Sequence, residues 1–540
     1  MRKKIYIVLI CIIILTGCGE KVEKGKNKDY ACASLYCDVE FWKSPIWDTT
    51  EGTIMGEISE KTGLTLDITV TMQEGNKQLS MMLVNDSLPD IMAVGDATII
   101  SQLITSGKVW KMEQFLEKYK PDSHLLKDYP NDTKREQIKR DGDWYAIASH
   151  INSEDARNTW KAEACYEELN EYGYNGAIIW NKALLQQAGL SVEELNTEQQ
   201  LIDAFEKVQN MNLSKDGEKV IPLLIDGMDY HQMTMEFLMS SFGAEYVDGQ
   251  GNYQDIFLQP ETKDVFRFLN RAVRNSYITP EQFKMDNDQI KSLISSGKVL
   301  CFIGNIANAG FDPFEWVASG PVFAENGKMP VLARNNRATT GWLNTFISKD
   351  CSNPEEIAEF IDFMTSEDGM LLWQFGYENI HYVRDEEGHV HRTKEGEKAF
   401  ADSRQTGMGA WWMFSNTAWE RSMLPAFREG SAEKADMKIQ TAYARNHKTM
   451  FYDNSLLSVS EALLPADSKY KSLNTTVNDW KKNQLPQILL ASDEMVFEQQ
   501  YQIFLKGLKE AGIEELKQIL DENYKRNCRE YGSFIKKVNE

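Results

Sequence analysis

The chain has 540 residues, of which 26% are charged and 11% are aromatic, and its formal net charge at pH 7 is −22. This length is sufficient for more than one domain with a large hydrophobic core. The negative charge disfavours anionic partners, so neither nucleic acid nor an acidic membrane surface is expected to bind the chain.

The first 17 residues are typical of a signal peptide. Three basic residues at positions 2–4 precede the apolar run Ile5–Leu15, which is shorter than the roughly 20 residues of a membrane-spanning helix. Residues 15–18 read Leu-Thr-Gly-Cys, the pattern of a bacterial lipobox, in which the Cys18 thiol takes the lipid. We therefore expect a lipid-anchored protein on the outer face of the cytoplasmic membrane. A plain signal peptide with a chance cysteine is the alternative.

Residues 18–31 are polar and rich in lysine, which predicts a flexible lipidated tether. Six cysteines follow the anchor, too few for a disulfide framework in so long a chain. Cys32 and Cys37 are the one local pair, and the sequence leaves open whether they form a disulfide. The others are Cys165, Cys301, Cys351 and Cys528.

The body alternates short apolar runs with longer segments of helical periodicity, which predicts an α/β fold. In chain order, strands are expected at 33–40, 64–70, 90–94, after Gly142, and at 178–180, 220–225 and 299–303. Helices are expected at 77–84, 98–104, 111–119, 182–188, 201–211, 233–242, 262–275, 289–296, 354–364, 493–508 and 513–525.

Seven short motifs in this order resemble those of the family 1 extracellular solute-binding lipoproteins, the carbohydrate receptors of ABC importers, in their long oligosaccharide-associated branch. Two of them depart from the family pattern: Ala148 or Ser149 stands where proline is usual, and Trp180 replaces a tyrosine. The motifs lie at residues 85–91, 103–119, 141–147, 180–190, 296–299, 353–382 and 509–524.

The resemblance implies a two-lobed, periplasmic-binding-protein-like α/β fold of type II, with a sheet in each lobe and a hinge that the chain crosses more than once. Residues 32–148 and 338–384 are expected to form lobe I, and residues 149–337 and 385–540 lobe II. The resemblance also implies a monomeric receptor without catalysis or cofactor, which delivers its solute to importer permease subunits.

Sugars present flat C–H faces and a rim of hydroxyls, so their sites combine aromatic rings with polar side chains. In open α/β sheets such sites lie at the carboxyl ends of strands. Aromatic and polar residues that follow predicted strands, or match the family's cleft segments in position, are therefore the candidate ligand-binding residues. They are Trp42, Trp47, Asp96, Trp180, Tyr230, His231, Asn305, Trp342, Trp411 and Trp412. For the adjacent pair Trp411 and Trp412, we expect one ring to face the cleft and the other to pack.

Two other classes of function compete with this reading. A surface sensor or a peptide-binding lipoprotein would share the fold. A secreted glycoside hydrolase would need two carboxyl groups close together, which sequence spacing cannot reveal. The sequence contains no zinc, nucleophile-elbow or phosphate-loop motif. The acidic run Asp286–Asp288 lacks the glycine and distal glutamate of a calcium loop, so no metal is expected.

Overall fold

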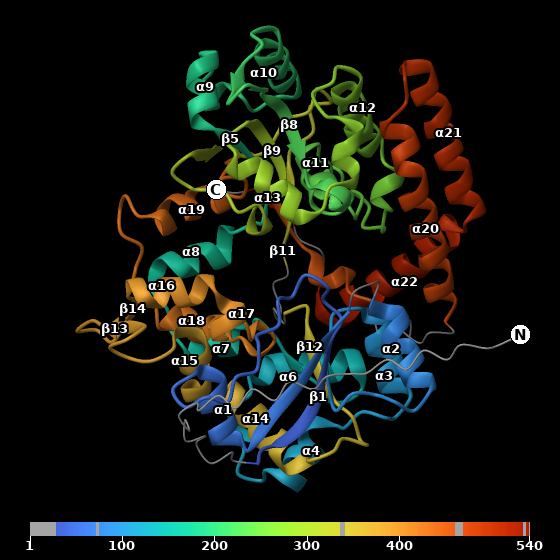
Figure 1. Ribbon diagram of the computed structural model, residues 1–540. Helices are drawn as coiled ribbons and strands as arrows, with labels where there is room; N and C mark the ends of the chain where they lie inside the picture. Colours follow the sequence, from blue (N-terminus) through green and yellow to red (C-terminus); the bar gives the residue numbers. More distant parts are fainter. Residues whose placement is uncertain (1–28, 72–74, 335–340, 460–467, 533–535, 539–540) are drawn as a thin grey trace, which may run out of the picture.

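The computed structural model of the chain describes residues 29–71, 75–334, 341–459, 468–532 and 536–538. Figure 1 shows two lobes, one above the other, each built around its own β-sheet with helices packed against it. The predicted signal peptide, the lipidation site at Cys18 and most of the tether lie outside the described residues. No helix within the described ranges is long and apolar enough to cross a membrane.

Lobe I, the lower lobe in Figure 1, contains a five-stranded sheet of order β2-β1-β3-β12-β4. β1 (Ala31–Cys37) lies between its parallel neighbours β2 (Leu64–Val70) and β3 (Ile91–Val94). β12 (Asn344–Ile347) runs antiparallel to β3 and to β4 (Ile147–Ala148). The helices of this lobe include α1 (Ile54–Thr62), α2 (Gly75–Val84), α3 (Ala97–Thr105), α4 (Met112–Tyr119), α5 (Leu125–Asp128), α6 (Asn131–Asp141), α7 (Glu154–Thr159), α14 (Pro354–Thr365) and α15 (Glu367–Phe375).

Residues 149–160 and 385–424 belong to lobe I, although the sequence-based division places them in lobe II. The side chains of Val390, Met408 and Trp419 are buried in the same hydrophobic core as β1 and α14. The last matched motif before residues 385–424 ends at Tyr382. No turn or composition signal after it indicates that the chain continues in the same hydrophobic core. The segment forms β13 (Tyr382–Arg384), β14 (Val390–Arg392), α16 (Lys394–Ala401), α17 (Ser403–Thr406), the 3-10 turn η6 (Trp412–Phe414) and α18 (Thr417–Ser422).

Lobe II contains a four-stranded sheet of order β10-β5-β9-β8. β8 (Ile221–Ile225) is parallel to β9 (Val299–Asn305), while β5 (Gly176–Asn181) is antiparallel to β9 and to β10 (Trp316–Ala318). Its helices are α8 (Ala164–Tyr172), α9 (Lys182–Ala188), α10 (Glu198–Asn210), α11 (Met233–Ser241), α12 (Pro260–Arg274), α13 (Asn287–Ser295), α19 (Ala432–Thr441), α20 (Lys469–Leu489), α21 (Glu494–Glu510) and α22 (Ile513–Tyr531).

Smaller elements complete the fold. β11 (Val331–Arg334), β15 (Met450–Asp453) and β16 (Lys536–Val538) form a three-stranded sheet, and β6 (Ser214–Lys215) pairs with β7 (Glu218–Lys219). Short 3-10 turns follow two of the lobe II strands, η2 (Gly227–Asp229) after β8 and η5 (Ile306–Asn308) after β9. The chain passes between the lobes after α7, between β11 and β12, and again after α18, which agrees with a hinge of several segments.

Local sequence signals account for most element boundaries. The predicted strand 64–70 is β2, and the predicted helix 182–188 is α9, which ends at Gly189 with a φ of 58°. This left-handed conformation suits glycine because it has no Cβ. Asp286 caps α13 and forms a capping box with Gln289, so the acidic run there begins a helix.

Cys32 and Cys37 do not form a disulfide. Both are free thiols on β1, one exposed and one buried. Five residues of strand separate their Cα atoms by about 16 Å, well beyond the 7 Å limit for a disulfide. The other four cysteines of the described chain are free as well.

Candidate functional site

Three aromatic side chains from distant parts of the sequence form an exposed cluster on lobe I. Phe41 follows β1, Trp342 precedes β12, and Trp412 begins η6. The Phe41 and Trp412 rings are stacked with centroids 6.4 Å apart, and the Trp342 centroid lies 5.6 Å from that of Trp412 and 6.5 Å from that of Phe41. Phe41 is 64% exposed and Trp342 is 50% exposed. We call these three residues the aromatic cluster.

The cluster rests on a glycine turn and on a histidine. A Cβ added to Gly95 would lie 2.9 Å from the Trp342 ring, so only glycine lets this indole approach the turn between β3 and α3. The His150 ring centroid lies 6.1 Å from that of Trp412, and its backbone N–H donates to Ser415 Oγ at 3.0 Å. Burial lowers the pKa of the His150 imidazole, which favours its neutral form.

A buried carboxylate holds the turn beneath the cluster. Asp38, directly after β1, accepts hydrogen bonds from the Gly95 N–H at 2.9 and 3.0 Å and from the Asp96 N–H at 3.3 Å. Burial raises the pKa of the Asp38 carboxyl despite these bonds. Asp96 in turn caps α3 by accepting from the N–H groups of Thr98 and Ile99. The predicted site residue Asp96 therefore builds the turn, and its carboxylate is already engaged.

Lobe II repeats this arrangement at its own strand ends. Asp226, directly after β8, accepts from the Asn305 N–H with both carboxylate oxygens, at 2.9 and 3.0 Å. A Cβ on Gly304 would lie 2.3 Å from Asp226 Oδ1, so this turn also requires glycine. Burial raises the pKa of Asp226 to about 7. The side chain of the predicted site residue Asn305 caps η5 through the Ala307 N–H.

Tyr230 and His231, the other predicted lobe II residues, follow η2. Tyr230 is buried, with its ring against Phe283 at a centroid distance of 4.9 Å. His231 is half-buried, and its Nδ1 lies 3.1 Å from the Met228 carbonyl oxygen. Burial lowers the pKa of the His231 imidazole. Of this pair, His231 has the more accessible side chain.

Three of the predicted tryptophans are buried inside the lobes, and their assignment to a ligand surface is corrected. Trp42, Trp180 and Trp411 are 4%, 0% and 0% exposed. Trp42 Nε1 donates to the Ala410 carbonyl oxygen and Trp180 Nε1 to Ser319 Oγ. Trp47 is half-buried, donates to Ser59 Oγ and packs its ring against Trp411. The rings of Trp42, Trp180 and Trp411 belong to the cores, because other side chains cover their faces and leave none for a solute, whereas Trp47 remains a proposed contact.

The residue predicted to contact the solute after the first strand, Trp42, is buried, and His150 was not among the predicted residues. Phe41 and Trp42 are adjacent, and the structure exposes the phenylalanine and buries the tryptophan. The expectation that only one of Trp411 and Trp412 packs inside is confirmed for Trp411, while Trp412 joins the aromatic cluster.

One polar contact joins the lobes beside the turn that Asp96 caps. Lys471 Nζ, at the start of α20, donates to Thr98 Oγ1 in the first turn of α3 at 3.0 Å. Burial lowers the pKa of Lys471, while the nearby Asp96 raises it. Within the described ranges, no group of three or more His, Cys, Asp or Glu side chains is arranged to hold a metal ion.

Comparison with known proteins places this geometry in a family. The curated polygalacturonan/rhamnogalacturonan-binding protein YtcQ of Bacillus subtilis (strain 168) is 22% identical over 350 residues, which cover 61% of this chain. The chain spans 64% of the length of that relative. The FusA substrate-binding protein of S. pneumoniae, solved with kestose, matches with a TM-score of 0.65 and 14% identity over 92% of this chain and 100% of FusA.

A second solved structure has the same fold. The human-milk-oligosaccharide-binding (HMO) solute-binding protein of Bifidobacterium longum infantis matches with a TM-score of 0.65 and 13% identity, over 92% of this chain and 99% of its own. Both neighbours are two-lobed solute-binding proteins, which confirms the predicted fold class. The model of the bacterial extracellular solute-binding protein family matches residues 47–371. The chain therefore belongs to the family of bacterial extracellular solute-binding proteins.

Proposed function

We propose that this protein captures an oligosaccharide between its lobes and delivers it to an ABC importer while tethered to the membrane through Cys18. The observation that carries the proposal is the aromatic cluster. Its exposed rings, Phe41 and Trp342, stand at the strand ends where open α/β sheets bind ligands. FusA bound to kestose and the polygalacturonan-binding relative support a carbohydrate solute.

The cluster has the chemistry that a sugar needs. Apolar C–H faces of a pyranose or furanose ring stack on indole and phenyl rings, while hydroxyls bind polar side chains at the rim. On lobe I, His150 stands beside Trp412. On lobe II, we propose that His231, the more accessible of the residues after η2, supplies a polar contact. A sugar that touched both sets of residues would favour the conformation in which the lobes are close.

The proposed tether rests on the lipobox at residues 15–18 and the polar stretch that follows. Two acyl chains on one cysteine anchor a protein stably, because each buried CH₂ contributes about 0.8 kcal/mol. A receptor held on the outer face of the membrane stays close to the permease that it supplies.

A thermal-shift screen of the full chain against neutral and acidic oligosaccharides tests the proposal. A ligand at 100 times its dissociation constant raises the free energy of unfolding by about 2.7 kcal/mol. We expect one sugar class to raise Tm and the variant Trp412→Ala to lose this shift. Phe314→Ala, which removes a 53% exposed ring on lobe II, is the matched control and should keep it.

The outcomes separate the competing functions. A shift with peptides and none with any sugar would favour a peptide receptor of the same fold. A shift with sugar that is accompanied by cleavage of the sugar would indicate a glycoside hydrolase. If a sugar binds without being cleaved, and binds wild type and Trp412→Ala with equal affinity, the binding site lies outside the aromatic cluster.

A further inference from the structure

Lobe I contains a cavity that the proposed function does not use. It has a volume of about 820 Å³, within the range of about 300–1,000 Å³ that small-molecule sites occupy. Its lining comes from α5, α7, the start of α6, the junction of α14 with α15, and the segment from η6 to α18. None of the three aromatic-cluster residues lines it.

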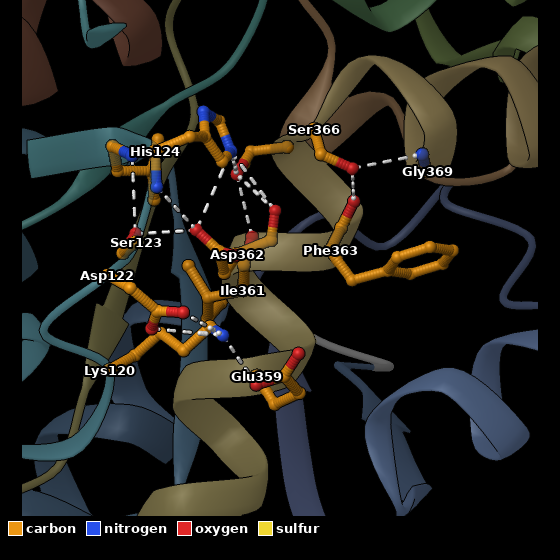
Figure 2. Close-up of polar contacts among 12 residues, drawn as sticks. Lys120, Asp122, Ser123, His124, Glu359, Ile361, Asp362, Phe363, Ser366 and Gly369 are labelled. Atoms are coloured by element: carbon orange, nitrogen blue, oxygen red, sulfur yellow. Dashed lines mark hydrogen bonds and ion pairs between the residues drawn. The ribbon is translucent and has the colours of Figure 1, made fainter. Parts of the chain in front are cut away.

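Figure 2 shows one wall of this cavity, where protein donors already occupy the carboxylates. Asp362 Oδ1 accepts from Ser123 Oγ at 2.6 Å and from the His124 N–H at 3.0 Å. Lys120 Nζ lies 3.1 Å from carboxylate oxygens of both Asp122 and Glu359. This wall is held in place by its own contacts, so a ligand is not needed to satisfy it.

A buried amide on another side of the cavity lacks an acceptor. Asn416 is only 7% exposed, and its Oδ1 accepts from the Trp419 N–H at 3.0 Å, which caps α18 and fixes the amide plane. Asn416 lines the cavity, and no residue of the described chain accepts a hydrogen bond from its Nδ2. This Nδ2 is not one of the fully buried unpartnered atoms, so it is accessible from the cavity and can donate a hydrogen bond to a ligand there.

Two carboxylates and an indole are the other groups of the cavity that could contact a ligand. Trp160 Nε1 donates to Glu367 Oε1 at 2.8 Å, which orients the carboxylate and leaves its second oxygen without a described partner. Asp155 uses Oδ2 to accept from the Asp132 N–H at 3.0 Å and has a second oxygen as well. All three side chains line the cavity, and its apolar part comes from Ile147, Ile151, Met370 and Phe414.

This combination suits a neutral molecule rich in hydroxyls. Hydroxyl groups can accept from the Asn416 amide and donate to the carboxylates of Asp155 and Glu367, while an apolar sugar face can pack on the Trp160 ring. The lining has five carboxylate residues against two lysines and one histidine, which disfavours an anionic ligand. We propose that this cavity is a second binding site, for a neutral mono- or disaccharide.

The two sites share one wall. The backbone N–H of Ile151 donates to the Ser415 carbonyl oxygen at 3.2 Å, joining the segment after β4 to the end of η6. His150 and Trp412 lie on the side of the aromatic cluster, whereas Ile151 and Asn416 line the cavity. The inference does not depend on the aromatic cluster, because each site has its own residues.

The test is a calorimetric titration of the full chain with maltose, cellobiose and lactose, each compared with anionic digalacturonate. Asn416→Asp keeps the oxygen that caps α18 but removes the amide donor, and Glu367→Gln keeps an acceptor for Trp160 while it replaces the second oxygen by a donor. Phe41→Ala perturbs only the aromatic cluster. We expect at least one neutral disaccharide to bind at least tenfold more weakly to Asn416→Asp and to Glu367→Gln, with unchanged affinity for Phe41→Ala and no binding of digalacturonate at this site.

Other patterns overturn the inference. Binding that is lost in Phe41→Ala and kept in Asn416→Asp places the sugar at the aromatic cluster, and binding lost in both indicates a single shared site. Binding kept in all variants, or absent for all three disaccharides, also overturns the second site. If no sugar binds in the cavity, the proposed function is unaffected, because the Trp412→Ala variant tests that function separately.

Discussion

Replacement of Asp226 by asparagine tests whether burial of the charged Asp226 carboxylate, directly after β8, lowers the free energy of unfolding. Burial raises its pKa from 3.8 to about 7, and the hydrogen bonds from the Asn305 and Thr234 region only partly oppose this. Because the folded chain holds this proton more tightly than the unfolded chain, the native state binds more protons between about pH 4 and pH 7. The contribution of Asp226 to stability is therefore greatest below about pH 4 and is lost as the pH rises through 7.

The size of the effect follows from the two pKa values. A change of one pKa unit corresponds to about 1.4 kcal/mol, so the change from 3.8 to about 7 is on the order of 4 kcal/mol. The Asn305 N–H remains bonded when the carboxyl is protonated, since one oxygen still accepts. An asparagine side chain retains that acceptor and never ionises, so it removes the pH dependence and keeps the turn.

The assay is urea unfolding of wild type and Asp226→Asn at pH 5 and pH 8, followed by far-UV circular dichroism. The difference in unfolding free energy between the two proteins should change between these pH values by about 3 kcal/mol, in favour of the variant at pH 8. Other titrating groups cancel in this comparison because both proteins carry them. A constant difference across the pH range would refute the argument from burial.

Three further predictions test the turn, the anchor and the contact between lobes. Gly304→Ala places a Cβ 2.3 Å from an Asp226 oxygen and should lower the unfolding free energy by about 1–3 kcal/mol in urea titrations, whereas Gly249→Ala, with open space around it, should not. Cys18→Ser should move the protein from the membrane fraction of cells to the medium, and equal membrane association would exclude lipidation there. Lys471→Met removes the hydrogen bond to α3 and should increase the radius of gyration of the sugar-free protein in small-angle X-ray scattering; an unchanged radius would show that the contact does not hold the lobes together.

Local signals predicted the fold well because they act over a few residues. Alternation gave the strand 64–70, and the helix 182–188 ended at Gly189 as the sequence indicates. The predicted lobe boundary after Arg384 was wrong because it depends on which core the later residues join. Val390 and Trp419 are apolar in either lobe, and nothing local distinguishes the two cores.

The candidate site was harder to predict because exposure is decided by contacts between distant segments. Trp42 is covered by Ala410 and Trp411, which lie more than 360 residues further along the chain. Its neighbour Phe41 is left exposed beside Trp412. The composition indicated that tryptophan rings could stack on a sugar, but it could not show that the larger ring of this pair packs inside.

The repeated turn explains why the polar residues predicted at the strand ends are poor candidates for direct solute contact. In both lobes an aspartate after one strand accepts hydrogen bonds from the backbone at the end of a neighbouring strand, Asp38 from the N–H of Gly95 and Asp226 from the N–H of Asn305, directly after Gly304. The glycine makes room for a neighbouring side chain, and the following Asp96 or Asn305 caps a helix. These carboxylates are therefore engaged by the backbone before any ligand arrives. Specificity for a solute must then come from side chains that the turns position, and on lobe I the indole of Trp342, seated on Gly95, is such a side chain.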